Sequence, residues 1–236
     1  MENKIDIFEI DIDALTAKDT LKRIVQFMES ETVNTVEIVT LELLIHGQDD
    51  SEWREMMRQM DLVLPGEKEI LEASEKAAGP LGGAAGSNGR LMKEMEKRVF
   101  LKMFLKYLQR TGKKVFLLAD QETDLLLLQE KLRPYAKGFL PAGHALLPQE
   151  GGRKDSVINE INGAEPDCII SVLPYPEQER FITEAKALLN ARLWIGCSLI
   201  LLQEENIKKP SGKLRKFLLK RTLRHLVDRQ KSRQEE

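Results

Sequence analysis

The residues best placed to do chemistry follow an apolar segment in the last third of the chain. Residues 168–173 contain Ser171 as their one polar side chain, which is typical of a strand in a parallel sheet covered on both faces. Residues 174–179 (Pro-Tyr-Pro-Glu-Gln-Glu) come next and indicate a proline-stiffened turn that opens a helix, with Gln178 and Glu179 in its first turn. Because open α/β sheets bind ligands beyond the carboxyl ends of their strands, this turn is a candidate binding site. The alternative is that the prolines only mark the start of a helix, where proline is common, and that the turn binds nothing.

Strand-like and helix-like segments alternate along the rest of the chain and must position these groups. Strands are expected at residues 36–40, 62–64, 115–119, 168–173 and 193–197, and helices at 16–29, 50–60, 67–77, 90–110, 122–132, around 157–161 and at 178–189. This alternation predicts an α/β fold, a Rossmann-like parallel sheet flanked by helices. Two glycine-rich stretches, residues 79–89 and 141–152, are expected to be irregular.

Charge is distributed unevenly over the 236 residues. Residues 1–205 hold 25 basic and 35 acidic side chains, whereas residues 206–234 hold six Lys and five Arg against one acid, Asp228. An acidic body with a basic end indicates an anionic partner for that end alone. We therefore expect an α/β domain over residues 1–205 and a basic amphipathic helical appendage over residues 206–236.

Three interpretations of the basic segment remain open. Apolar residues such as Phe217 and Leu218 alternate with its Lys and Arg residues, a pattern that suits an anionic membrane surface contacted through residues 206–233. A terminal helix docked on the sheet, with its charges solvated, is the second. Nucleic acid ranks last, because no interleaved aromatic platform accompanies the charges.

Several other classes of site lack support in the sequence. The two cysteines, Cys168 and Cys197, form no Cys-x-x-Cys pair, so zinc and thioredoxin-type chemistry are not indicated. The three histidines are scattered and no Gly-x-Ser-x-Gly elbow is present. Asp11 and Asp13 have the spacing of a divalent-metal motif, but a structural role is the favoured interpretation. No signal peptide is evident and no apolar run approaches the ~20 residues of a membrane span, so a cytoplasmic protein is expected.

A resemblance to a known family runs through these segments in collinear order. Residues 176–179 (Pro-Glu-Gln-Glu) resemble the Pro-x-Gln-Glu signature of the WecG/TagA/CpsF family of bacterial glycosyltransferases. Residues 12–16 (Ile-Asp-Ala-Leu-Thr) resemble that family's opening motif, and residues 61–65, 112–118 and 194–196 resemble three of its strands. The resemblance implies inverting transfer of an N-acetylmannosamine-type sugar from a UDP donor to a lipid-diphosphate-linked acceptor. It further implies a reaction at the cytoplasmic membrane face, peripheral attachment, no metal or other cofactor, and a protein that can self-associate.

The resemblance also implies the site residues. Glu67 is expected to act as a substitute general base and Thr40 to take part in catalysis. Arg224, with its neighbour Arg221, is expected to contact the acceptor diphosphate. The remaining substrate-binding residues would be Glu42, Pro65, Gly66, Gln178, Glu179 and Gly196.

Some matched positions depart from the family's pattern. Gly66 stands where the family has the aspartate proposed as general base, Glu42 replaces an asparagine, and Val172, Pro174, Ser198 and Leu199 stand where glycines are expected. Losing a base typically costs about 10²- to 10⁴-fold in rate. Two hypotheses follow: a divergent active transferase, or a non-catalytic relative that binds a nucleotide sugar or a partner transferase.

Overall fold

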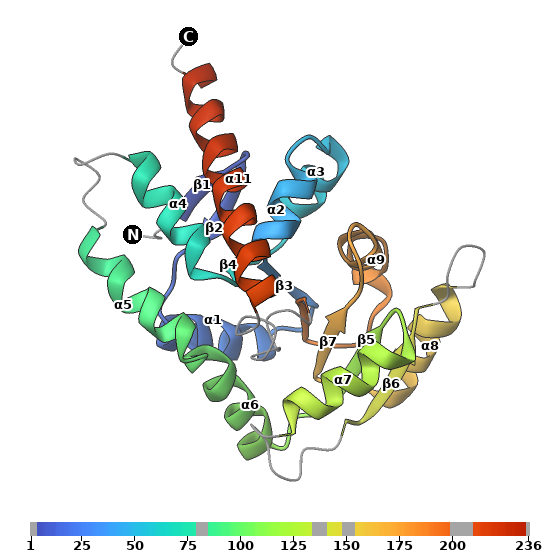
Figure 1. Ribbon diagram of the computed structural model, residues 1–236. Helices are drawn as coiled ribbons and strands as arrows, with labels where there is room; N and C mark the ends of the chain where they lie inside the picture. Colours follow the sequence, from blue (N-terminus) through green and yellow to red (C-terminus); the bar gives the residue numbers. More distant parts are fainter. Residues whose placement is uncertain (1–3, 79–84, 134–140, 148–153, 199–209, 235–236) are drawn as a thin grey trace.

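A six-stranded parallel sheet forms the centre of the computed structural model, which describes residues 4–78, 85–133, 141–147, 154–198 and 210–234 (Figure 1). The strand order is β4-β3-β8-β7-β5-β6. The bounds are β3 (Asn34–Val39), β4 (Leu62–Pro65), β5 (Val115–Ala119), β6 (Gly143–Leu146), β7 (Cys168–Val172) and β8 (Leu193–Gly196). The predicted α/β class with a Rossmann-like parallel sheet is confirmed.

Strand β6 corrects the expectation of irregular structure for residues 143–146; residues 148–152 of that stretch lie outside the described residues. It pairs with β5 as the edge of the sheet, with Gly143 opposite Phe116. A Cβ atom at Gly143 would come within 2.7 Å of the Phe116 ring, so the glycine that made the segment look irregular is what admits this pairing.

Helices cover both faces of the sheet because alternate strand residues point to opposite sides. One face packs against α1 (Ala17–Met28), α6 (Val99–Thr111) and α7 (Glu122–Leu132). The other face packs against α8 (Lys154–Ala164) and α9 (Glu177–Ala185); α9 continues into a 3₁₀ turn, η1 (Lys186–Leu188). Burial on two faces explains the nearly continuous apolar runs of β5 and β7.

The helix expected over residues 90–110 is two helices, α5 (Ala85–Glu96) and α6. The chain turns at Arg98, which has a left-handed backbone with φ of 51°. Because of this break, the two helices pack against different parts of the protein. Leu91 of α5 packs with Leu71 and Ala14, whereas Phe104 of α6 packs on the sheet.

A third apolar cluster lies beside the β4 edge. It joins an antiparallel hairpin, β1 (Lys4–Ile7) and β2 (Ile10–Asp13), to α2 (Leu41–Gly47), α3 (Ser51–Arg58) and α4 (Lys68–Ala78). The Asp13 carboxylate at the end of the hairpin is buried and accepts a hydrogen bond from the Val63 amide at 3.1 Å. Of the Asp-x-Asp pair, Asp13 therefore has the structural role that the sequence favoured.

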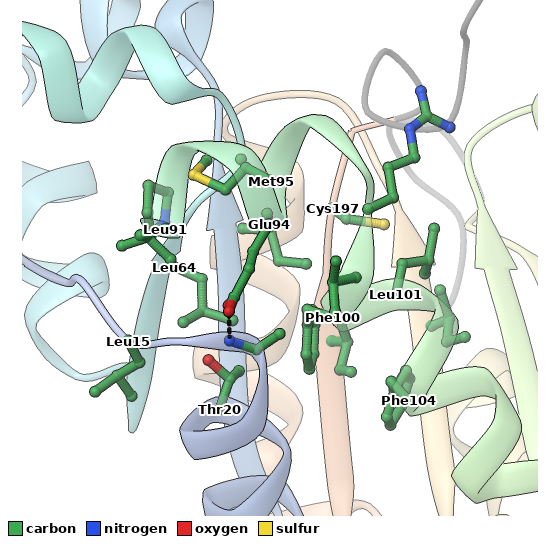
Figure 2. Close-up of a pocket in the computed structure, with 18 of the residues that line it drawn as sticks. Leu15, Thr20, Leu64, Leu91, Glu94, Met95, Phe100, Leu101, Phe104 and Cys197 are labelled. Carbon is green, nitrogen blue, oxygen red and sulfur yellow. Dashed lines mark hydrogen bonds between the residues drawn. The ribbon is translucent and has the colours of Figure 1, made fainter. Parts of the chain in front are cut away.

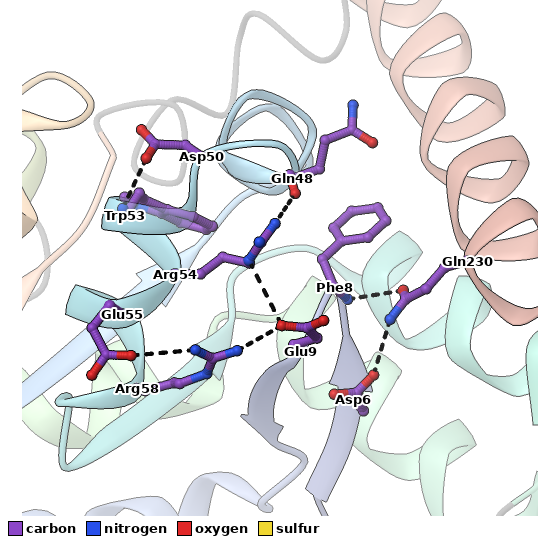
Figure 3. Close-up of polar contacts among 10 residues, drawn as sticks. All are labelled: Asp6, Phe8, Glu9, Gln48, Asp50, Trp53, Arg54, Glu55, Arg58 and Gln230. Atoms are coloured by element: carbon purple, nitrogen blue, oxygen red, sulfur yellow. Dashed lines mark hydrogen bonds and ion pairs between the residues drawn. The ribbon is translucent and has the colours of Figure 1, made fainter. Parts of the chain in front are cut away.

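The basic segment forms the long helix α11 (Pro210–Gln234), which passes α2 and α4 (Figure 1). Leu223 and Val227 of α11 are buried in the third cluster. Near its far end, the Gln230 side chain accepts a hydrogen bond from the Phe8 amide at 3.0 Å and donates one to Asp6 (Figure 3). Helix α11 is therefore docked on the protein, but against α2 and α4, and several of its charges are paired with acidic side chains where solvated charges were expected.

Candidate functional site

The loop after β7 borders the point where the strand order reverses. Strand β7 connects to β8 toward one edge of the sheet, whereas β5 connects to β6 toward the other. Ligands of open α/β sheets bind in the crevice at such a point, beyond the carboxyl ends of the strands. The turn that precedes Gln178 and Glu179 therefore lies where the sequence predicted a site.

A row of three residues crosses the sheet just below this edge. Glu37 of β3 is paired with Gly196 of β8, and Gly196 is paired with Ser171 of β7. All three point to the α9 face, because the alternate residues of these strands pack into the opposite core. Glu37 and Ser171 have no exposed surface. A carboxylate and a hydroxyl are therefore buried in the sheet just below its carboxyl edge.

Gln178 ties this row to the turn that opens α9. Its side-chain amide donates a hydrogen bond to Glu37 Oε1 at 2.7 Å, and its carbonyl accepts one from the Leu173 amide at 3.1 Å. Gly196 makes the bridge possible, since a Cβ atom there would lie 1.9 Å from Glu37 Oε2 and 2.8 Å from Gln178 Nε2. Gln178 thus joins β3, the end of β7 and the start of α9 into one rigid unit.

The buried carboxyl groups have perturbed proton affinities. Burial raises the pKa of Glu37 well above the ordinary carboxyl value; the nearby Glu179 adds to the rise and the Gln178 amide opposes it. Burial also raises the pKa of Glu179 to about 7, against the opposing effect of the Trp53 indole. Strongly perturbed groups in a crevice are typical of functional sites.

Several of these buried polar atoms are not satisfied by the protein. Within the described part of the chain, Glu37 Oε2, Ser171 Oγ and both Glu179 carboxylate oxygens make no hydrogen bond of normal geometry. The Trp53 indole lowers the pKa of Glu179, but its N–H does not form a hydrogen bond of normal geometry with the carboxylate. Because buried polar groups are normally paired, this cluster is an exception of the kind that marks functional regions.

Tyr175 connects the turn before α9 to the start of α3. Its hydroxyl donates a hydrogen bond to Asp50 Oδ2 at 2.6 Å, and its ring meets the Trp53 ring edge-on at a centroid distance of 5.9 Å. Asp50 also caps α3 by accepting a hydrogen bond from the Trp53 amide at 3.0 Å (Figure 3). That bond and the one from Tyr175 hold the pKa of Asp50 below its usual value. The start of α3 therefore braces the turn before α9.

The loops after β3 and β4 form a second group of predicted residues. The Gly66 amide donates to the Val39 carbonyl at 2.8 Å, which ties the two loops together. Glu67 Oε2 accepts a hydrogen bond from the Leu41 amide at 2.8 Å, and the Thr40 hydroxyl accepts one from Leu43 at 3.2 Å. Both side chains therefore cap α2.

Glu67 is consequently a buried cap in this conformation. Burial raises its pKa, while the Leu41 amide and Lys216 act in the opposite direction. The Lys216 ammonium of α11 lies 3.6 Å from Glu67 and 3.1 Å from Glu69. To act as a base, Glu67 would have to exchange its bond to Leu41 for one to a substrate hydroxyl.

The cations that α11 places beside the residues after β3 and β4 are not the ones that the sequence predicted. Arg215 Nη2 lies 2.6 Å from both carboxylate oxygens of Glu42, beside Lys216. Arg224 instead pairs with Glu72 of α4 at 3.4 Å, eight residues or about 12 Å further along the helix. Arg221 is exposed. Arg221 and Arg224 therefore lie away from the loops after β3 and β4, and Arg215 and Lys216 are the cations of α11 that lie beside Glu42 and Glu67.

The structure thus sorts the predicted residues into two groups and adds one that sequence reasoning missed. Gln178, Glu179 and Gly196 come together below the edge. The others lie at or next to the carboxyl ends of β3 and β4: Thr40, Glu42 in the first turn of α2, Pro65 at the end of β4, Gly66 and Glu67. Glu37 was missed, although a carboxylate inside the apolar strand Asn34–Val39 was a visible signal. Of the residues that replace family glycines, Val172 is buried, Pro174 is exposed, and Leu199 lies outside the described residues.

Among the residues that the structure describes, no three His, Cys, Asp or Glu side chains are grouped so as to hold a metal ion. None of the described helices combines the length and apolar character that a membrane crossing needs.

Comparison with known proteins identifies the family. The sequence profile of the glycosyl transferase WecG/TagA/CpsF family matches residues 5–203, which includes every strand of the sheet and both loop groups. No curated protein matches the chain. The profile covers most of the 236-residue chain. The chain belongs to the WecG/TagA/CpsF family of glycosyl transferases.

Proposed function

We propose that the protein transfers an N-acetylhexosamine, similar to N-acetylmannosamine, from a UDP donor to a lipid-diphosphate-linked acceptor. Its product would enter cell-surface polysaccharide or teichoic acid synthesis. The observation that carries the proposal is the bridge from Gln178 to Glu37, which fixes the family's Pro-x-Gln-Glu turn at the edge where parallel sheets bind ligands. Membership of a glycosyltransferase family supports transfer in general.

The donor would lie against two groups of residues, those that follow β3 and β4 and those at the turn before α9. Pro65, Gly66, Thr40 and Glu42 would contribute from the loops after β3 and β4. Gln178, Glu179 and Gly196 would act from beneath by fixing the shape of the turn, since Gln178 and Glu179 are buried and both polar atoms of the Gln178 amide are engaged within the protein.

Glu67 would act as general base toward the acceptor hydroxyl. A carboxylate with a raised pKa accepts a proton more readily once it is ionised, and general-base catalysis of this kind is worth about 10²- to 10⁴-fold. We expect Glu67→Gln to lower kcat by about 10²-fold or more and to leave donor binding intact. An unchanged rate in a direct transfer assay would remove Glu67 from the mechanism.

The neighbouring position provides a gain-of-function test. Gly66→Asp restores the carboxylate that the family resemblance expects, and transfer should rise. An unchanged rate would show that Gly66 is not what limits activity.

Attachment to the inner face of the cell membrane would use the start of α11. Leu214, Phe217 and Leu218 form one exposed apolar stripe, with 61%, 60% and 53% of their surfaces accessible. Their spacing places them on one side of the helix, and the exposed Arg221 continues that side. Apolar side chains beside a cation suit adsorption to an anionic lipid surface. The acceptor diphosphate would meet Arg215 and Lys216; Arg221 and Arg224 stay candidates for a later contact.

A non-catalytic role is the second candidate. Two observations favour it: Gly66 stands at the family's base position, and Glu67 is engaged in capping α2. In that case the protein would bind a nucleotide sugar, or a partner transferase, without turnover. Self-association would be compatible with either role.

Incubation with a panel of UDP-sugars and a soluble lipid-diphosphate acceptor analogue distinguishes the two candidates. Transfer of an N-acetylhexosamine would support the enzyme. Thermal stabilisation by a UDP-sugar without transfer would support the binding protein. The absence of both would contradict the proposed function.

A further inference from the structure

An apolar cavity lies on the other face of the sheet, between α1, α5, α6 and the strands (Figure 2). Its volume is about 140 Å³. Figure 2 shows side chains from α5 and α6 over the cavity and residues of β4 and α1 beside and below it. Among its walls are Leu64, Leu91, Met95, Phe100, Leu101 and Phe104.

The polar residues of the lining are engaged elsewhere. Glu94 accepts hydrogen bonds from the Ala17 amide at 2.8 Å and from Arg90 at 2.9 Å. The Thr20 hydroxyl donates to the Thr16 carbonyl at 2.9 Å. A nucleobase or sugar would lose its hydration here without gaining partners, whereas a hydrocarbon would not. The cavity therefore suits an apolar ligand.

The cavity reaches the loop that carries the proposed base. Pro65 and Gly66 belong to its lining, and Glu67 follows directly. On the α11 side of this loop, Lys216 lies 3.6 Å from Glu67, and the exposed stripe that includes Phe217 begins at the same end of α11. A face fit for lipid and a cavity fit for hydrocarbon thus adjoin one loop.

We propose that this cavity binds the first carbons of the acceptor's lipid chain, next to its diphosphate. The inference rests on the proposed function, because it takes the acceptor to be a lipid diphosphate. An apolar cavity of roughly 150 Å³ lined by Leu, Ile and Phe accepts benzene, so 140 Å³ has room for about six carbons, or one branched five-carbon isoprenoid unit. The remainder of the chain stays in the membrane.

The size of the cavity sets a chain-length dependence. Burying one methylene contributes about 0.8 kcal/mol, which is about fourfold in affinity. We expect the acceptor KM to fall by up to fourfold for each carbon added to a detergent-free series. The effect should flatten near about six carbons, when the cavity is full. An acceptor KM that is the same for all chain lengths, with transfer intact, would overturn the cavity inference and leave the proposed function standing.

Variants that fill the cavity provide the matched test. Leu101→Trp on α6 and Met95→Trp on α5 should abolish the chain-length dependence, while kcat with the shortest acceptor and the KM of the UDP donor stay at the wild-type values. Leu126→Trp is the control, since Leu126 is exposed on α7. If both filling variants fold, as judged by thermal unfolding, and keep the wild-type chain-length dependence, the cavity is not the chain site.

A binding measurement separates this inference from catalysis. Calorimetric titration with geranyl diphosphate and with inorganic diphosphate should give at least tenfold tighter binding of the geranyl compound to the wild type. The preference should be lost in Leu101→Trp and kept in Leu126→Trp. Equal affinities of the wild type for the two probes would overturn the inference. Failure of transfer with all acceptors would count against the proposed function instead.

Discussion

At the scale of single residues, Gly196 shows how one absent side chain shapes the site. Glu37 Oε2 and Gln178 Nε2 occupy the space that a Cβ atom would need. A methyl group there would displace a carboxylate and an amide that are both buried. The glycine that the family resemblance assigns to substrate binding is therefore required by the polar row beneath the crevice.

This contact predicts the effect of adding one methyl group. We expect Gly196→Ala to lower the free energy of unfolding by about 1–3 kcal/mol, measured by urea denaturation. Gly163→Ala is the control, because a Cβ atom at that position in α8 meets nothing within 4 Å and should be neutral or stabilising by up to about 1 kcal/mol. Equal effects of the two substitutions would contradict the packing described for Gly196.

The buried carboxyl of Glu179 predicts a pH dependence of stability. Its pKa is raised from 4.5 to about 7, so between these values the folded protein binds more protons than the unfolded chain. The free energy of unfolding should therefore fall as pH rises through this window, by an amount on the order of 3 kcal/mol, and level off above it. Glu37, whose pKa is also raised, acts in the same direction.

Urea denaturation at several pH values between about 4.5 and about 8 checks this sign. Glu179→Gln should reduce the fall, because the glutamine does not titrate. A stability that rises with pH through this window in the wild type, or an unchanged profile in the variant, would show that Glu179 does not hold its proton as described.

At the scale of elements, α11 combines two functions on two sides. Its inner side packs into the third cluster through Leu223, which has no exposed surface. Lys220 and Arg224 on the same side pair with Glu72 of α4. Its outer side carries the apolar stripe that includes Leu218. Several of the basic side chains therefore hold the helix on the acidic body, and the stripe stays exposed; it is the part of α11 that we propose as the membrane contact.

Substitutions on the two sides of α11 should have different effects. Leu223→Ala removes a buried side chain and should cost about 2–5 kcal/mol of unfolding free energy. Leu218→Ala should change stability by less than about 0.5 kcal/mol but weaken adsorption to anionic vesicles in a sedimentation assay. Vesicle binding that is unaffected by Leu218→Ala, and by the same change at Phe217, would argue against the stripe as the membrane contact.

Sequence patterns predict the elements where local signals agree. The strand Val115–Ala119 and the helix Glu122–Leu132 match their expected bounds, because apolar runs and turn residues mark both. The helix α2 was not expected, since its Thr40 cap lies inside an apolar run. Its start is capped by Thr40 and also by Glu67, which lies 26 residues beyond its partner Leu41.

The site was predictable in position but not in its contacts. The Pro-x-Gln-Glu motif marked the turn after β7 through local chemistry. The partner of Gln178 is Glu37, 141 residues earlier, and strand order alone brings the two together. A carboxylate within an apolar strand signals a special role, but the sequence does not say which residue across the sheet will face it. The sequence likewise does not say which acidic residues will pair with the Lys and Arg residues of α11.

At the scale of the whole molecule, three features lie around the carboxyl edge of the sheet, and we propose a different ligand for each. The polar row and the turn of α9 lie on one face, the apolar cavity lies on the other, and the start of α11 lies beside the loops after β3 and β4. A nucleotide sugar, a lipid chain and a membrane surface would approach the same place from different directions. This convergence is what a transferase acting on a lipid-linked acceptor requires.

We propose that the carboxyl edge of the sheet binds a uridine diphosphate sugar. Isothermal titration of the wild type with UDP, with ADP as the control ligand, measures this binding. We expect saturable binding of UDP that is at least tenfold tighter than that of ADP and is weakened by Gly196→Ala at a pH where both proteins are folded. No detectable binding of UDP or of any UDP-sugar by the folded protein would contradict it.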